Sequence, residues 1–227
     1  MSSEGNPELN LAFEFVQFTN RNIFLTGKAG TGKTTFLHRL REKLSKRMIV
    51  LAPTGVAAIN AGGVTIHSFF QLPFHPHIPT QYLKTPIPSA IESSSFKMSR
   101  EKLNIIRSLG LLIIDEISMV RADLLDAIDL VLRKFKDRTQ PFGGVQLLMI
   151  GDIQQLSPVA KKEEWEILSE YYDTPFFFGS MALKNTDYVT IELKRIYRQQ
   201  DKNFIDILNK VRDNLLDNAG LTLLNKR

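Results

Sequence analysis

The chain has 227 residues, and its 29 lysines and arginines outnumber its 24 aspartates and glutamates, which gives a net charge of +5. It contains no cysteine, so disulfides, thiol catalysis and cysteine-based zinc sites are excluded, as suits a reducing compartment. The hydrophobic fraction of 43% is ample for a buried core. No apolar run is long enough to span a membrane, and we expect no secretion signal. The basic excess is compatible with nucleic-acid binding, although scattered surface lysines would give the same total.

The first elements surround a glycine-rich loop. The pattern predicts a helix over residues 8–20 and a buried strand over residues 22–26. Residues 27–34 then match the phosphate-binding pattern G-x-x-x-x-G-K-[ST] at every fixed position. After the loop, apolar residues recur on one face of a predicted helix: Phe36, Leu37, Leu40 and Leu44. Strand, glycine turn and helix N-terminus form an arrangement that binds phosphate.

This loop predicts a nucleoside triphosphate site. Lys33 is expected to reach the β- and γ-phosphates, and Thr34 to offer its hydroxyl to Mg²⁺. The loop residues expected to contact the nucleotide are Gly27, Ala29, Gly30, Thr31, Gly32, Lys33, Thr34 and Thr35.

Alternating strands and helices continue along the chain. Short apolar runs predict further strands at residues 48–52, 111–114, 145–150 and 188–191. Helical patterns cover a small-residue segment after residue 54, the segment around residues 124–135, and residues 201–216. The alternation predicts an α/β fold with a mostly parallel sheet flanked by helices.

One segment departs from this alternation. Residues 71–100 are rich in proline, serine and histidine, which predicts a surface excursion. His75 and His77 lie there without a third ligand at a suitable spacing, so we interpret them as loop residues.

Polar groups follow two of the predicted strands directly, at the sheet edge where ligands of parallel sheets bind. Asp115 is expected to organise Mg²⁺, and Glu116 to accept a proton from an attacking water. The loop over residues 151–159 contains Gln154 and Gln155, either of which could contact the γ-phosphate. A structural polar loop is the alternative for that segment.

Six segments together resemble the petite-integration-frequency (PIF) family of DNA helicases, in the RecD-like branch of helicase superfamily one. They are GKAGTGKTT (27–35), LAPTGVAA (51–58), GGVTIHSFF (62–70), LLIIDEISMV (111–120), PFGGVQLLMIGDIQQLSPV (141–159) and IYRQQDKNFIDILNKVR (196–212). They occur in the family's order, and the fifth segment separates this family from other P-loop ATPases.

The resemblance implies a RecA-like P-loop NTPase domain that uses ATP and Mg²⁺ to move on single-stranded DNA and to unwind it 5′ to 3′. Roles in DNA repair, recombination and telomere maintenance go with the family. By position, Lys33 and Glu116 would be catalytic, Gln155 rather than Gln154 would sense the γ-phosphate, and Thr34 and Asp115 would hold the metal. Arg198 matches an arginine that reaches the γ-phosphate from a second motor domain, with a surface arginine as its alternative.

The resemblance also implies a DNA track. Its residues would be Pro53, Thr54, Gly55, Thr65, His67, Ser68 and Phe69. Small hydroxyls and backbone amides can hold DNA phosphates, and His67 or Phe69 could stack on a base, although Phe69 could equally lie in the core.

Two positions depart from the family pattern. Asn10, 17 residues before Gly27, stands where the family has a glutamine that reads the adenine edge, and a shorter amide could still bind adenine. Ser157 replaces a usual proline.

The resemblance also divides the chain into domains. Residues 1–190 are expected to form a first RecA-like motor domain, and residues 191–227 the start of a truncated second one. We therefore expect a monomeric fragment of a longer helicase, which binds ATP and single-stranded DNA but does not unwind DNA alone. The intact protein would act on DNA forks, with no membrane partner, and would be cytoplasmic: nucleoid-associated in a bacterium, nuclear or mitochondrial in a eukaryote.

Two other readings remain open. A P-loop kinase acting on small molecules would explain the loop but not the other five segments. A non-catalytic nucleotide- or DNA-binding module would keep Lys33 and Asp115 for binding alone.

Overall fold

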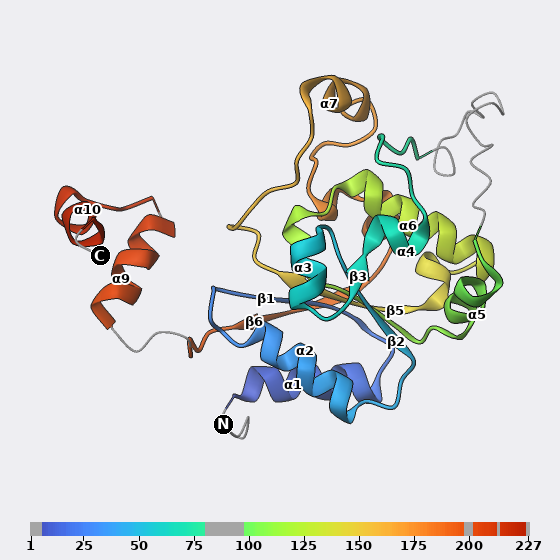
Figure 1. The fold of residues 1–227 in the computed structure, drawn as a ribbon, viewed down its shortest axis with the longest axis horizontal. Coiled ribbons are helices and arrows are strands. Elements are labelled where there is room, and N and C mark those ends of the chain that lie inside the picture. The colour runs from blue at the N-terminus through green and yellow to red at the C-terminus, as the bar shows by residue number, and fades with distance from the viewer. Residues whose placement is uncertain (1–5, 80–97, 198–201, 213, 226–227) are drawn as a thin grey trace.

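The computed structural model describes residues 6–79, 98–197, 202–212 and 214–225. A six-stranded sheet forms its centre, with strand order β3-β2-β4-β5-β1-β6 and parallel pairing throughout (Figure 1). The strands are β1 (Asn22–Gly27), β2 (Met48–Ala52), β3 (Val64–Thr65), β4 (Leu111–Ile114), β5 (Gln146–Gly151) and β6 (Tyr188–Leu193). Every residue of β4 and β5 is buried, as expected of strands covered on both faces. The predicted α/β fold is confirmed.

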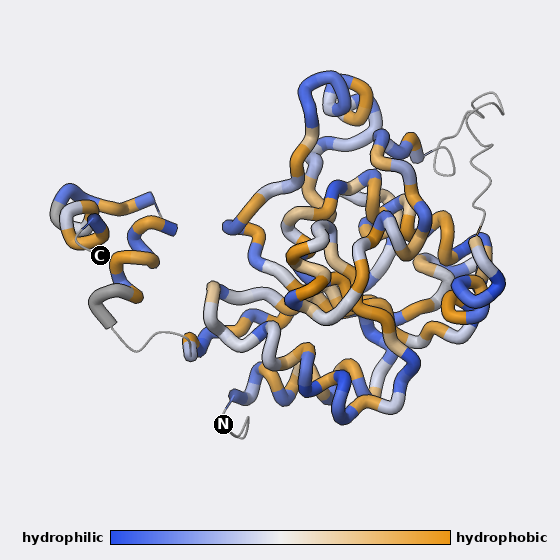
Figure 2. Tube along the Cα trace, in the orientation of Figure 1, coloured by the Kyte–Doolittle hydropathy of each residue, from blue (hydrophilic) through white to orange (hydrophobic). Residues whose placement is uncertain are grey.

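Helices cover both faces of the sheet and create two hydrophobic cores. On one face, α1 (Pro7–Phe18) and α2 (Lys33–Lys43) pack over β1. The other face carries α4 (Ile66–Phe70), α5 (Arg100–Ser108), α6 (Ala122–Phe135) and α8 (Met181–Lys184). The remaining helices are α3 (Gly55–Asn60), α7 (Lys162–Leu168), α9 (Lys202–Arg212) and α10 (Asn218–Leu224). Figure 2 shows hydrophobic residues concentrated in the strands. No helix in these described ranges is long and apolar enough to cross a membrane.

The start of the segment 141–159, the fifth of those that carry the resemblance, is held against α6. Phe142 lies in a short 3₁₀ turn (Pro141–Gly144) and adopts a left-handed φ of 51°. Its ring is buried, and its backbone N–H donates to Asp129 of α6 at 2.5 Å. Asp129 also pairs with Arg133 at 2.8 Å. These contacts fix the start of β5 against α6, and so position the residues that follow the other end of β5.

A second anchor joins α6 to α8. The buried carboxylate of Asp126 accepts hydrogen bonds from the Tyr172 hydroxyl at 2.8 Å and the Ser180 hydroxyl at 2.5 Å. It also accepts from the backbone N–H groups of Met181 and Ala182 at 3.1 and 2.9 Å. The four donors offset part of the cost of burying this carboxylate, and burial still raises the pKa of Asp126.

The C-terminal segment differs from the sequence prediction. The helix predicted over residues 201–216 is observed as α9, which ends at Arg212, and α10 was not predicted. Asn214, which lies between the two helices, has a left-handed φ of 55°. The helices α5, α7 and α8 also lacked a sequence prediction. The expected domain boundary near residue 190 falls within β6, which pairs with β1 along its whole length.

Candidate nucleotide and DNA sites

The phosphate loop connects the end of β1 to the start of α2. Gly30 and Gly32 have φ values of 80° and 96°, which favour glycine, and Gly32 is the N-cap of α2. No side chain caps this helix, and its first turn contains no acidic residue. The first backbone N–H groups of α2 therefore remain available to an anion, at the end of the helix that attracts negative charge.

Lys33 lies inside this loop. Its Nζ donates to the carbonyl oxygens of Gly27 at 2.5 Å and Lys28 at 3.1 Å. Burial lowers the pKa of Lys33, while the nearby carboxylates of Asp152, Glu116 and Asp115 act to raise it. The structure thus brings together the groups predicted to follow β1, β4 and β5, and adds Asp152 to them.

Asp115 and Glu116 follow β4 at the same edge. Burial raises the pKa of both carboxyl groups; the N–H of Glu116, 3.0 Å from Asp115 Oδ1, opposes this at Asp115, while Asp115 raises the pKa of Glu116 further. Glu116 has a left-handed φ of 50°, a strained conformation for a residue with a side chain. A carboxylate with a raised pKa is a better proton acceptor near neutral pH, which suits Glu116 as a general base.

The donor set fits Mg²⁺ bound together with phosphate. In the described residues no three acidic or histidine side chains form a cluster that could hold a metal alone. Mg²⁺ commonly uses only one or two protein ligands beside substrate phosphates and waters. The Asp115 carboxylate and the exposed Thr34 hydroxyl could supply them.

The turn after β5 carries the predicted glutamine. Gln155 is exposed, and its Nε2 donates to the buried Asp152 carboxylate at 3.2 Å. Arg212 of α9 also pairs with Asp152. Arg198, predicted to reach the γ-phosphate, lies outside the described residues.

The region beside the loop contains Asn10 and an aromatic residue that sequence reasoning missed. Asn10 Oδ1 accepts a hydrogen bond from Arg39 at 2.8 Å, so this amide is tied to α2. The backbone N–H of Tyr197 donates to Gly30 at 2.8 Å, and its half-exposed ring lies next to Gly32. The sequence signal that could have indicated Tyr197 as a site residue is its position directly before Arg198.

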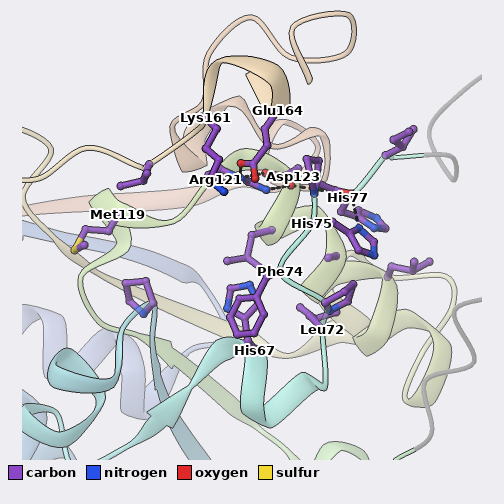
Figure 3. A pocket seen from close by; sticks show the side chains of 18 of the residues that line it. His67, Leu72, Phe74, His75, His77, Met119, Arg121, Asp123, Lys161 and Glu164 are labelled. Carbon is purple, nitrogen blue, oxygen red and sulfur yellow. Dashed lines mark hydrogen bonds and ion pairs between the residues drawn. The ribbon is translucent and has the colours of Figure 1, made fainter. Parts of the chain in front are cut away.

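Three of the residues predicted to bind DNA line a cavity of about 1180 Å³: Pro53, Thr54 and His67. Figure 3 shows His67 in this cavity. The hydroxyls of Thr54 and Thr65 accept N–H bonds from Ala57 and Ser68, at 3.2 and 3.3 Å, and so cap α3 and α4. Gly55 and Ser68 are exposed. The segments after β2 and β3 therefore contribute three of the predicted residues to this cavity, and two of their hydroxyls serve as helix caps.

Two alternatives were left open for Phe69 from the sequence, and the structure shows the second, a place in the core. Phe69 is 5% exposed and packs with Phe70, so its ring does not face a ligand in this structure. The physical reason is that Ile66, Phe69 and Phe70 lie on the inner face of α4.

Phe74, unlike Phe69, presents an exposed aromatic ring to the cavity. Sequence reasoning missed it because it lies in the proline-rich excursion. It is 81% exposed and stacks on His67, with ring centroids 4.6 Å apart (Figure 3). Burial lowers the pKa of His67 and Arg121 lowers it further, while Asp123 acts to raise it, so the neutral form of the ring is favoured. The cavity thus presents a flat pair of stacked rings to a ligand.

Basic side chains line the same cavity as this ring pair. The basic residues lining the cavity are Arg121, Arg133, Lys134, Arg138 and Lys161. Arg121 is held by Asp123 at 2.9 Å and by Glu164 at 2.6 Å. Such a surface combines cations with a stacking platform, as single-stranded nucleic acid requires.

Comparison with known proteins identifies the family. The model of the PIF1-like helicase family matches residues 9–219. The chain belongs to the PIF1-like helicase family. It is 39% identical over 197 residues to the ATP-dependent DNA helicase PIF1 of Saccharomyces cerevisiae, a match that covers 84% of this chain and 21% of the relative. Human PIF1, also an ATP-dependent DNA helicase, is 37% identical over 194 residues, which cover 85% of this chain and 27% of the human protein.

Solved structures of this family share the fold. The Pif1 helicase from Bacteroides, in complex with ADP-AlF3 and single-stranded DNA, matches with a TM-score of 0.86 and 47% identity. This match covers 96% of the present chain and 48% of the Bacteroides chain. It confirms the predicted RecA-like fold. The chain spans about half the length of the Bacteroides chain, and 21% and 27% of the two curated relatives.

Proposed function

We propose that residues 1–190 are the first motor domain, and residues 191–227 the start of the second, of an ATP-dependent helicase that moves 5′ to 3′ on single-stranded DNA and opens DNA forks. The observation that carries this proposal is that a candidate nucleotide site and a candidate DNA site lie at the same edge of the sheet. Lys33 lies there near the carboxylates of Asp115 and Glu116, and the cavity with His67 and Phe74 lies alongside.

The nucleotide side would work through groups already in place. Lys33 and the first N–H groups of α2 would bind the phosphates, and Thr34 and Asp115 would hold Mg²⁺. Bound Mg²⁺ would neutralise charge that develops on the phosphate oxygens. Glu116 would take the proton of the attacking water, and Gln155 would contact the γ-phosphate. Arg198 would add a second cation from the following motor domain.

The DNA side is connected to the nucleotide side through the sheet. β2 pairs with β4, and the backbone N–H of Asp115 donates to Leu51 at 2.8 Å. The DNA-facing residues that follow β2 and the catalytic residues that follow β4 therefore start from adjacent, hydrogen-bonded strands. A shift of the end of β2 relative to the end of β4 would therefore move residues of both the nucleotide site and the DNA site.

Strand separation on tailed duplexes tests the proposal. We expect the longer protein that contains this chain to unwind a duplex with a 5′ single-stranded tail in an ATP-dependent manner, and to leave a 3′-tailed duplex intact. We expect the 227-residue chain alone to separate neither substrate. Unwinding of the 3′-tailed duplex alone would refute the proposed polarity, and strand separation by the shorter chain would show that a second motor domain is not required.

A further inference from the structure

A buried carboxylate after β5 joins three segments of the chain. Asp152 is 1% exposed and accepts two hydrogen bonds from the Arg212 guanidinium, of which Nη2 to Oδ1 is 2.8 Å long. It also accepts from the backbone N–H of Gln154 and from Gln155 Nε2, both at 3.2 Å. Burial alone would raise the pKa of Asp152, but the bonds from Arg212 and Gln154 outweigh it and hold the pKa below its ordinary value. Asp152 is therefore a charged and fully occupied acceptor.

Helix α9 reaches both loops that face the proposed triphosphate. Arg212 contacts the turn after β5, and Asn209, three residues earlier on the same helix face, accepts a hydrogen bond from Lys28 at 2.7 Å. Lys28 belongs to the phosphate loop. Arg212 also acts to lower the pKa of Lys33, so its charge lies within electrostatic range of that site. Two polar contacts thus place α9 across the nucleotide side of the sheet.

The shared carboxylate determines how Gln155 is presented. An amide nitrogen has two N–H groups, so Gln155 can give one to Asp152 and keep the other for a phosphate oxygen. This division requires the carboxylate to stay ionised and in one orientation. The planar guanidinium fork of Arg212 supplies both conditions, because it binds the two carboxylate oxygens at once.

We propose that Arg212 is a positioning residue, which acts through Asp152 to orient Gln155 toward the γ-phosphate and so lets the site distinguish ATP from ADP. The inference rests on the proposed function. It assigns to α9 a part in nucleotide recognition that does not involve Arg198. Without Arg212, the Asp152 carboxylate loses its cation and its fixed orientation, and the amide of Gln155 is no longer aligned.

Calorimetric titration of the 227-residue chain with ADP and with a non-hydrolysable ATP analogue tests this role. The wild-type chain should bind the ATP analogue more tightly than ADP. In Arg212→Ala the preference for the analogue should fall about tenfold, as expected for loss of a hydrogen bond to a charged group, while ADP affinity is unchanged. Arg212→Lys, which keeps the charge but not the fork, should retain part of the preference. Lys210→Ala on the same helix, an exposed cation that pairs with Asp217, is the matched control and should behave as wild type.

The double variant Asp152→Asn/Arg212→Ala tests whether Arg212 acts on Gln155 through Asp152. If Arg212 acts through Asp152, then Asp152→Asn should also reduce the preference, and combining it with Arg212→Ala should cause no further loss. A merely structural role would lower the affinities for ADP and the analogue by the same factor. That result would overturn the inference but not the proposed function. The same holds if Arg212→Ala keeps the wild-type preference for the ATP analogue, or if the wild-type chain binds ADP and the analogue equally tightly. A wild-type chain that binds neither nucleotide would overturn the proposed function with it.

Discussion

The ring of Phe74 stacks on the imidazole of His67, with an interplanar angle of 22° and centroids 4.6 Å apart. The two residues come from different segments, since His67 is in α4 and Phe74 is in the excursion that follows it. One ring is mostly exposed and the other half-buried, so the pair extends from the protein surface into the cavity. A nucleobase could continue this stack.

Phe74→Ala should weaken binding of single-stranded DNA to the 227-residue chain by about tenfold, which corresponds to the loss of stacking on one base. Fluorescence anisotropy of a labelled oligothymidine measures this. Phe18→Ala removes another exposed phenylalanine, at the end of α1 on the opposite face of the sheet, and should have no effect. Equal losses in both variants would show that Phe74 is not part of the DNA surface.

Lys33→Ala should reduce the affinity for ATP by more than about tenfold, because it removes a cation that would bind phosphate through charged hydrogen bonds. The melting temperature should change little, since burial already disfavours the charged form of Lys33. Lys43→Ala, an exposed lysine at the end of the same helix, should bind ATP as wild type does. Calorimetry checks all three proteins, and ATP affinity retained in Lys33→Ala would remove the loop from the proposed site.

Glu116→Gln should bind ATP at least as tightly as wild type and should lower the hydrolysis rate by about 10²- to 10⁴-fold in the longer protein, as expected for loss of a general base. The change keeps the size of the side chain and removes one negative charge near the phosphates. Phosphate release under ATP saturation measures the rate. A rate near that of wild type would assign the proton transfer to another group.

Asp126→Ala should lower the free energy of unfolding by about 4 kcal/mol, because it leaves buried hydroxyl and backbone N–H donors without an acceptor. Asp173→Ala removes a carboxylate that is 92% exposed in its pair with Lys184, and should leave stability unchanged. Urea denaturation compares the two. Equal effects would mean that the Asp126 contacts do not anchor α8 to α6.

The strands and the nucleotide loop are predictable from sequence because their patterns are local. A buried parallel strand is a short apolar run, and the residues directly after it must lie at the carboxyl edge of the sheet. That rule is enough to predict that Asp115 and Glu116 lie near Lys33, as they do in the fold.

The missed contacts depend on segments far apart in the sequence. Asp152 and Arg212 are 60 residues apart, and no local pattern indicates that α9 returns to the turn after β5. The burial of Phe69 was one of the two alternatives stated from the sequence, and the spacing of Ile66, Phe69 and Phe70, which is that of one buried helix face, favours it. The contact of Phe74 with His67 could not be predicted, because the neighbouring prolines indicate a loop but not where that loop packs.

The most direct test of an ATP-driven DNA motor is the rate of ATP hydrolysis by the longer protein, measured with and without single-stranded DNA. We expect DNA to stimulate the rate, Lys33→Ala to abolish hydrolysis, and Phe74→Ala to require more DNA for the same stimulation. A rate that does not respond to DNA, or transfer of phosphate to an added nucleoside monophosphate, would contradict the account.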